Sequence, residues 1–410
     1  MDKRLEKYCD LIVRRGVNIQ KNQTLVINSS VETAEVVRVI TGKAFAAGAG
    51  DVVVQWEDEG TDKVRYLNAD IGTFKKFEPW NKLKFDSLSK KGAAFLTVKS
   101  SDPEVFKDVN VEKLVEYGKA RAGGMKVYRQ MQSRVDLQWC VCSAPSEGWA
   151  LKVFSGEKDS QTAIKKLWNA IYTCSGVDKN DVFENWKKHE ADLKKRTALL
   201  NKHNFKSLHY KNSLGTDLVI GLPAGHIWNC ATSYKSGTGV NFSPNIPTEE
   251  IFTCPDRNIT EGVVYGSKPF MFLGTLIEDF AVWFKAGKVV RVKAGKKQEA
   301  LERLVSSFKN SNRLGEVALV PYDSPISKSG ILFYNTLIDE NASCHLAFGR
   351  ATSTWVKDTT GKSEAELMKM GVNISDTHND FMVGTKDMSI TGIKNDGKTV
   401  DVFVNGNFTL

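Results

Sequence analysis

The sequence predicts an α/β open-sheet domain followed by an α+β, mainly β domain. In the first half, short apolar segments alternate with amphipathic segments of helical length. Residues 160–204 then carry apolar residues at helical spacing on a background of Lys and Glu. Beyond them, short apolar segments are separated by glycine-containing turns. We therefore divide the chain into residues 1–204, which include the helical bridge, and residues 205–410.

The first half begins with alternating helices and strands. Residues 2–15 place apolar side chains on one face of a helix that ends at Gly16. Next come a buried strand at 24–28, a helix at 31–47 and a second strand at 51–56. This β-α-β order predicts two parallel strands with a right-handed crossover. Further strands are expected at 93–98 and 135–142, with a helix near 111–122 between them.

A dinucleotide site is the usual interpretation of such a sheet, but the first turn argues against it. That site needs glycines directly after the first strand, so that a pyrophosphate can approach the backbone. Here the turn reads Ser29-Ser30-Val31, and Gly48 and Gly50 follow a helix instead. We therefore interpret the first domain as a scaffold or as a wall of the substrate-access path.

The second half predicts an α+β, largely β domain. The expected elements are strands at 208–210 and 217–221, a meander at 270–276, 280–285 and 289–292, a helix at 298–309, and a last strand at 400–404. Ser363 and Glu366 have the spacing of a capping box before a short helix that ends at Gly371.

Composition excludes several classes of protein. The seven cysteines are scattered, without a CxxC pair, which favours a reduced, cytoplasmic protein. The first ten residues are charged and polar, unlike a signal peptide, and no apolar run approaches the roughly 20 residues of a membrane span. The net charge of +9 comes from short basic clusters beside acidic residues. A solvated surface explains this pattern better than nucleic-acid binding, so we expect neither nucleic acid nor membrane as a partner.

Two histidines of the second half differ from the other four. His345 lies in the apolar run NASCHLAFG, and His378 precedes Asp380 by two positions in SDTHNDFMVG. Residues i and i+2 of a strand point to the same side, so His378 and Asp380 would stand side by side. A lone buried histidine is usually a core residue with a hydrogen-bond partner, but a neighbouring buried carboxylate needs a partner such as a metal ion.

Glutamates in similar settings lie upstream of these histidines. Glu316 begins the apolar segment EVALV, and Glu249 and Glu250 precede Ile251 and Phe252, which should draw the segment inward. Adjacent residues of an extended chain point in opposite directions, so one glutamate of the pair faces a site. We expect the five residues of the site to bind two divalent ions: Glu250, Glu316, His345, His378 and Asp380. Carboxylates and imidazoles suit Zn²⁺, Co²⁺ or Mn²⁺, and two such ions would support hydrolysis by a metal-bridging hydroxide.

The segments NIPTEEIFTCP, GEVALVPYDSPISKSGILFYNTLIDENASCHLAFG and THNDFMVG resemble the M29 metallopeptidases, the aminopeptidase T group, and the similarity spans nearly the whole chain. The resemblance implies an aminopeptidase of broad specificity that releases N-terminal amino acids from peptides. It implies an N-terminal α/β domain, a C-terminal metal-binding domain and a homodimer. It assigns the second glutamate of the pair, Glu250, to the metals with the four other ligands, and it implies Co²⁺ or Zn²⁺ as the two ions.

One position departs from the pattern of this family. Its members typically have a tyrosine seven residues after the first ligand histidine, His345, and Thr352 occupies this place here. That tyrosine is thought to hydrogen-bond the oxyanion. We therefore interpret Thr352 as its catalytic counterpart, unless Arg350 or Tyr322 replaces it, and we interpret Glu249 as the candidate general base. The alternative is a metal-binding family member whose peptidase activity is lost or altered.

Overall fold

The computed structural model describes residues 2–272 and 274–410. Two compact units divide the chain. The first consists of Met1–His189, Ala231–Thr248 and Leu332–Leu337, and the second of Glu190–Cys230, Glu249–Ile331 and Ile338–Leu410. Each unit is thus built from separate segments, whereas the boundary that we predict after residue 204 divides the chain only once. That boundary stays a prediction.

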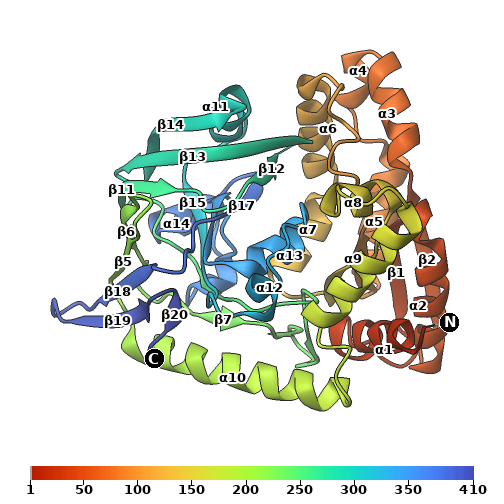
Figure 1. Ribbon diagram of the computed structural model, residues 1–410, viewed down its shortest axis with the longest axis horizontal. Coiled ribbons are helices and arrows are strands. Elements are labelled where there is room, and N and C mark those ends of the chain that lie inside the picture. The colour runs from red at the N-terminus through yellow and green to blue at the C-terminus, as the bar shows by residue number, and fades with distance from the viewer. Residues whose placement is uncertain (1, 273) are drawn as a thin grey trace. The chain divides into compact units, whose positions relative to one another are not determined.

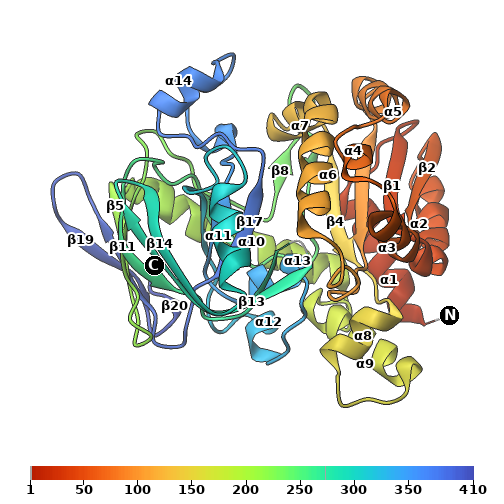
Figure 2. The same ribbon diagram turned by 90° about the horizontal axis from the view of Figure 1, so that it is seen from above.

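The first unit contains a parallel sheet, as the β-α-β pattern predicts. Its strand order is β2-β1-β3-β4, and Figures 1 and 2 show its first strands beside helix α2 (Ala34–Ala46). The bounds are β1 (Thr24–Ser30), β2 (Asp51–Glu57), β3 (Ala94–Lys99) and β4 (Trp139–Ser143). All neighbouring strands pair in parallel. The predicted strand at 135–142 begins late because Val135 has a φ of 58°, outside the range of a strand.

Helices cover both faces of this sheet. Val36, Val37 and Ile40 of α2 are buried where that helix packs against β1 and β2. On the other face, Val26 and Phe95 belong to an apolar cluster that includes residues of α5 and α7. The helices of this unit are α1 (Lys3–Leu11), η1 (Ile12–Gly16), η2 (Val31–Thr33), α2 (Ala34–Ala46), α3 (Glu59–Asn68), α4 (Ile71–Phe74), α5 (Pro79–Lys90), α6 (Val111–Gly124), α7 (Lys126–Ser133), α8 (Glu147–Val153) and α9 (Ser160–Cys174). The hairpin β8 (Ser233–Tyr234) and β9 (Asn241–Phe242) also belongs to it, and α10 (Val182–His203) leads into the second unit.

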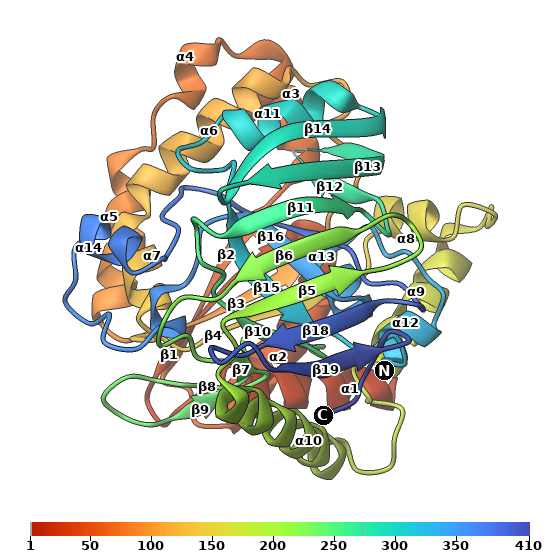
Figure 3. The same ribbon diagram turned by 90° about the vertical axis from the view of Figure 1, so that its left-hand side faces the viewer.

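The second unit contains a long antiparallel sheet, which Figure 3 shows from its broad side. The strand order is β12-β13-β11-β6-β5-β18-β19-β20, with β14 paired to β13. The bounds are β5 (Ser207–Lys211), β6 (Asp217–Gly221), β11 (Thr260–Tyr265), β12 (Phe270–Phe272), β13 (Thr275–Lys285), β14 (Lys288–Lys296), β18 (Ser389–Ile393), β19 (Thr399–Val404) and β20 (Asn407–Phe408). The predicted meander is present as β12, β13 and β14, but the bounds of its first two strands were wrong: the expected strand at 270–276 is divided between β12 and β13, which pair with each other, and β13 runs without a break from 275 to 285.

A second antiparallel sheet of this unit has the order β17-β16-β15-β10-β7. Its strands are β7 (Asn229–Cys230), β10 (Ile251–Thr253), β15 (Leu314–Leu319), β16 (His345–Gly349) and β17 (His378–Met382). On one face, Phe381 stacks on Phe348 at 4.4 Å and contacts Phe280 of the long sheet at 5.9 Å between ring centroids. The two sheets therefore pack through aromatic side chains, and the opposite face of the smaller sheet is available for other contacts.

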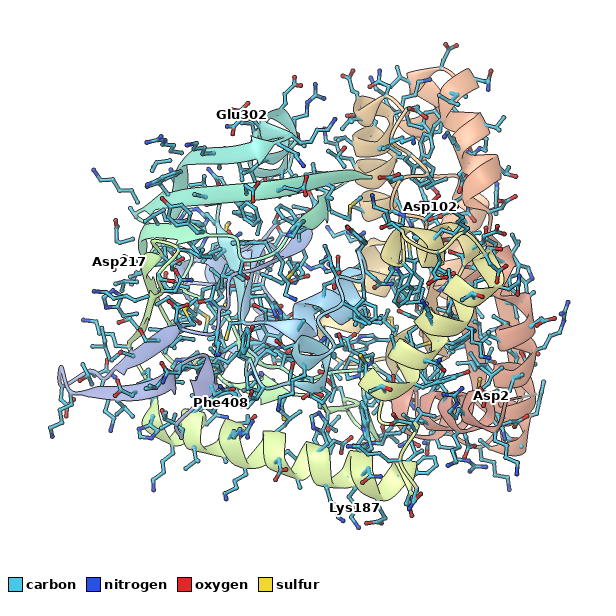
Figure 4. The ribbon with its side chains drawn as sticks, in the orientation of Figure 1. Asp2, Asp102, Lys187, Asp217, Glu302 and Phe408 are labelled. Carbon is cyan, nitrogen blue, oxygen red and sulfur yellow. The ribbon has the colours of Figure 1, made fainter. Side chains whose placement is uncertain are left out.

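The remaining helices are short. They are α11 (Gln298–Ser306), α12 (Pro325–Lys328), α13 (Thr336–Asp339), η3 (Glu340–Ala342), η4 (Ser353–Trp355) and α14 (Glu364–Lys369). The predicted capping box of Ser363 and Glu366 is present at the start of α14. Exposed charges such as Lys187 and Glu302 extend from the ribbon in Figure 4. Within residues 2–272 and 274–410, no helix has the length and the apolar character that a membrane crossing requires.

Candidate metal centre

Three strands of the smaller sheet align the first two acidic side chains of the site. Glu316 of β15 lies opposite Ala347 of β16, and Ala347 lies opposite Asp380 of β17. Directly opposite residues of antiparallel strands point to the same face of the sheet. The small side chain of Ala347 therefore leaves room above the sheet between the two carboxylates.

The histidines lie on both sides of this row. His345 precedes Ala347 by two residues and therefore points to the same face, while His378 lies opposite Gly349. Glu250 comes directly before β10, and its carboxylate reaches His345 with 3.1 Å between Oε2 and Nε2. Predicted ligands from four separate segments thus converge on one face of one sheet.

Glu316 lies at the centre of the arrangement. Its Oε2 lies 3.2 Å from Nε2 of His378, and its Oε1 lies 4.0 Å from Nε2 of His345. Asp380 completes the second side, with 3.2 Å between its Oδ1 and Nε2 of His378. Two groups of possible metal ligands result, Glu250–Glu316–His345 and Glu316–His378–Asp380, and the ligand atoms of each lie within 4.8 Å of one another.

Backbone carbonyls fix the orientation of both imidazoles. Nδ1 of His345 lies 3.2 Å from the carbonyl oxygen of Ser343, and Nδ1 of His378 lies 2.7 Å from that of Arg350. A carbonyl oxygen only accepts, so each Nδ1 carries the proton and donates it. Nε2 then faces the carboxylates and would offer its lone pair once a cation replaces its proton, which is the arrangement of a metal-binding histidine.

The charges of the cluster perturb one another strongly. Burial raises the pKa of Glu316 to about 7, although His378 opposes this change. Burial alone would lower the pKa of His345, but the hydrogen bond and the charge of Glu250 raise it to about 9. Burial would raise the pKa of Asp380, but the imidazolium of His378 holds it below its usual value. Without a cation, the histidines must therefore hold protons to balance the carboxylates.

Glu340 is a buried carboxylate that the sequence reasoning missed. It begins η3, and burial together with Asp380, Glu250 and Glu316 raises its pKa well above the usual value. The signal available in the sequence was the pair of acidic residues Asp339 and Glu340, which lies a few positions before His345. Interaction with three of the predicted ligands makes Glu340 part of the same electrostatic cluster.

The two predicted catalytic residues lie outside both groups of possible ligands in the described part of the chain. Glu249 is buried, and its backbone N–H donates to Oδ1 of Asn341 at 2.7 Å. Thr352 is half-buried directly before η4. Arg350 is partly buried and interacts electrostatically with Asp376 and Asp380. The catalytic roles of Glu249 and Thr352 stay predictions.

The donor set fits two divalent cations. Each group offers two carboxylates and one imidazole, a mixture of oxygen and nitrogen ligands that suits Zn²⁺, Co²⁺ or Mn²⁺. The shared carboxylate has one oxygen directed to each histidine. Two cations would also remove the need for protonated histidines among these carboxylates. The geometry therefore supports hydrolysis of a polarised carbonyl.

Comparisons with known proteins agree with this chemistry. A family model described as thermophilic metalloprotease (M29) matches residues 1–408. Aminopeptidase AmpS of Bacillus subtilis is 42% identical over 405 residues, which cover 99% of this chain and 98% of the relative. Aminopeptidase PepS of Streptococcus thermophilus is 38% identical over 406 residues, with the same shares of both chains. The solved structure of wild-type AmpT from Thermus thermophilus has a TM-score of 0.91 and 34% identity, and the match covers 100% of this chain and 99% of that one.

Proposed function

The chain belongs to the M29 family and is a metalloaminopeptidase, and on this premise we propose that it holds two divalent ions through five side chains. Glu250 and His345 would bind the first ion, His378 and Asp380 the second, and Glu316 both. The observation that supports this proposal best is the position of Glu316, which belongs to both groups of possible ligands. Zn²⁺ or Co²⁺ is the expected ion, and Mn²⁺ fits the same donors.

We propose that the substrates are peptides with a free N-terminus and that specificity is broad. Bound ions would polarise the scissile carbonyl and lower the pKa of the attacking water. The free α-amine of the peptide would be a further ligand of these ions. Carbonyl oxygens at Ser343 and Arg350 keep both imidazoles in the tautomer that this site needs.

Proton transfer needs a carboxylate near the ions, and two glutamates are candidates. Glu249 adjoins Glu250 in the chain and is buried. Glu340 interacts electrostatically with Glu250, Glu316 and Asp380, which supports it as a candidate. We propose one of them as the general base. Glu249→Gln and Glu340→Gln separate the two, because loss of the base should lower kcat by about 10²–10⁴-fold while metal content is kept.

Thr352 would assist by donating a hydrogen bond to the oxyanion of the transition state. Its position before η4 is half-exposed, so a substrate can reach it. Loss of one such donor costs on the order of 10²–10³ in kcat. Thr352→Val removes the hydroxyl but keeps the shape of the side chain. An unchanged kcat in this variant would remove Thr352 from the mechanism.

The first experiment measures leucine release from a leucine-containing peptide. Protein stripped of metal is assayed alone and after addition of Zn²⁺ or Co²⁺. Metal-dependent release with about two ions bound per chain is the expected result. Two bound ions without any release would support the alternative, a metal-binding protein with lost or altered peptidase activity. Thr352→Tyr would then test whether the missing tyrosine is the cause.

The cellular setting is also a proposal. We propose a cytoplasmic protein, because the seven cysteines are buried and outside any disulfide, as in a reducing compartment. We also propose a homodimer, as the family resemblance implies. Light scattering of the metal-loaded protein checks the dimer. A monomer at working concentration would contradict it.

A further inference from the structure

An aromatic side chain stands beside the metal centre on the same face of the smaller sheet. Phe252 of β10 lies opposite Ala318 of β15, and Ala318 lies opposite His345 of β16. All three therefore point to the face that carries the site. Because neighbouring strands lie about 4.8 Å apart, the Cα atoms of Phe252 and His345 are separated by roughly 10 Å. The small Ala318 between them leaves that space to the side chains of Phe252 and Glu250.

Trp355 extends this aromatic surface. Its ring lies 4.8 Å from that of Phe252 between centroids, with an interplanar angle of 54°. The backbone around it is held in place, since the carbonyl oxygen of Trp355 accepts from the N–H of Ile227 at 2.7 Å. Behind the ring, Trp355 packs against a buried apolar cluster that includes Ala351 and Val356. Trp355 is thus held by this cluster and by its backbone, and Phe252 packs on the Trp355 ring.

The pair differs from the core in its exposure. On the opposite face of the same strands, Ile251, Val317 and Leu346 are fully buried. Phe252 and Trp355, in contrast, are both only half-buried, as are His378 and Asp380 of the metal centre. A purely structural aromatic pair would gain more by complete burial. The partly open rings therefore lie on the face of the sheet that carries the ligands, next to the buried Glu250 and His345, while His378 and Asp380 are the more open ligands of that face.

We propose that Phe252 and Trp355 form the wall that contacts the side chain of the substrate's N-terminal residue. This inference rests on the proposed aminopeptidase function, in which the α-amine of the peptide is held at the metal centre. The N-terminal side chain branches one atom away from that amine. An apolar wall next to Glu250 would then favour large apolar residues, such as leucine and phenylalanine, over glycine and alanine within a broad range of substrates.

The size of the preference follows from the apolar contact. One methylene in an apolar pocket is worth about 10–200-fold in kcat/KM, and an aromatic contact adds to this. Removal of the Phe252 ring should therefore lower kcat/KM for Leu and Phe substrates by about 10–200-fold. Glycine and alanine substrates do not reach the wall, so their kcat/KM should remain near the wild-type value.

The test compares p-nitroanilides of glycine, alanine, leucine and phenylalanine on the zinc-loaded protein. Phe252→Ala and Trp355→Ala should lose the preference for the large residues, and Phe252→Leu should keep part of it. Trp283→Ala is the matched control, because Trp283 is a half-buried aromatic residue of β13 in the long sheet and outside the metal centre. It should leave the substrate preference unchanged. Metal content and melting temperature show that each variant is folded.

Two outcomes would overturn the proposal. One is a parallel loss of activity on all four substrates by Phe252→Ala with metal retained. The other is an unchanged preference. If the wild-type protein binds two ions but hydrolyses none of the substrates, the aminopeptidase proposal fails by itself. Calorimetric binding of L-phenylalanine and glycine to the zinc-loaded protein then tests the aromatic wall by itself. The wall predicts that phenylalanine binds more tightly than glycine, and that this difference disappears in Phe252→Ala.

Discussion

Replacement of Glu316 by glutamine should have opposite effects on the metal-loaded and the metal-free protein. Glu316 presents one carboxylate oxygen to each histidine of the site. Glutamine keeps one oxygen but puts an NH₂ group in place of the other, and that group cannot bind a metal ion. Glu316→Gln should therefore lose at least one of the two proposed ions. Glu250→Gln, which changes only one group of ligands, should leave the second ion in place.

The magnitudes follow from the same geometry. An ion that polarises a carbonyl contributes several kcal/mol, so kcat/KM should fall by on the order of 10²–10³. In the metal-free protein, burial raises the pKa of Glu316 from 4.5 to about 7. At 1.36 kcal/mol per pKa unit this corresponds to about 3 kcal/mol of destabilisation when the carboxylate is ionised. Metal-free Glu316→Gln should thus be more stable than metal-free wild type at pH 8, by about 1–3 kcal/mol.

Three measurements check this prediction. Atomic absorption gives the ions per chain, leucine release gives kcat/KM, and urea denaturation at pH 8 gives the free energy of unfolding with and without metal. Glu299→Gln is the control, because this glutamate is exposed on α11 and its only ion pair in the described residues, with Arg303, is long at 3.7 Å. A Glu316→Gln protein with two ions and wild-type activity would refute the shared role of Glu316. A metal-free variant less stable than metal-free wild type would refute the electrostatic reasoning.

Three further predictions concern stability. Metal-free wild type should lose stability as the pH rises, because the pKa of Glu316 rises from 4.5 in the unfolded chain to about 7 in the fold, and that of His345 from 6.5 to about 9. The proton on Glu316 therefore stops stabilising the fold between pH 4.5 and about 7, and the charge of His345 between pH 6.5 and about 9. Urea denaturation at pH 5, 7 and 9 tests this, and a flat profile would contradict it. Phe381→Ala should lower the free energy of unfolding by about 3–5 kcal/mol, since Phe381 is fully buried between two sheets. Chemical denaturation of the metal-loaded protein measures this loss, and a loss below about 1 kcal/mol would contradict that packing. Ser363→Ala should cost about 1 kcal/mol by removing the N-cap of α14, visible as faster amide exchange in that helix and not in α11.

Much of the fold was predictable because local patterns decide it. The apolar segments of β1 and β2 and the helix between them specify a parallel pair, and the structure has that pair in register from Thr24 to Ser30. The capping box of Ser363 also acts within one turn of chain. Other elements were missed, such as α3 and α5, because their faces are weakly apolar: in α3 only Tyr66 is buried. Their positions are decided by packing rather than by local sequence.

The sequence by itself determined which residue types are gathered at the site, and tertiary structure decided how they meet. The spacing of His378 and Asp380 already placed both on one side of a strand, because alternation is a local property of extended chain. The pairing of β15, β16 and β17 is not local, and only this pairing puts Glu316 and Asp380 on either side of Ala347. The same is true of Glu340, whose role in the cluster depends on carboxylates up to 90 residues away in the chain, at Glu250. Charges interact through space, so the sequence around Glu340 shows an acidic residue before His345 but not the carboxylates that it meets.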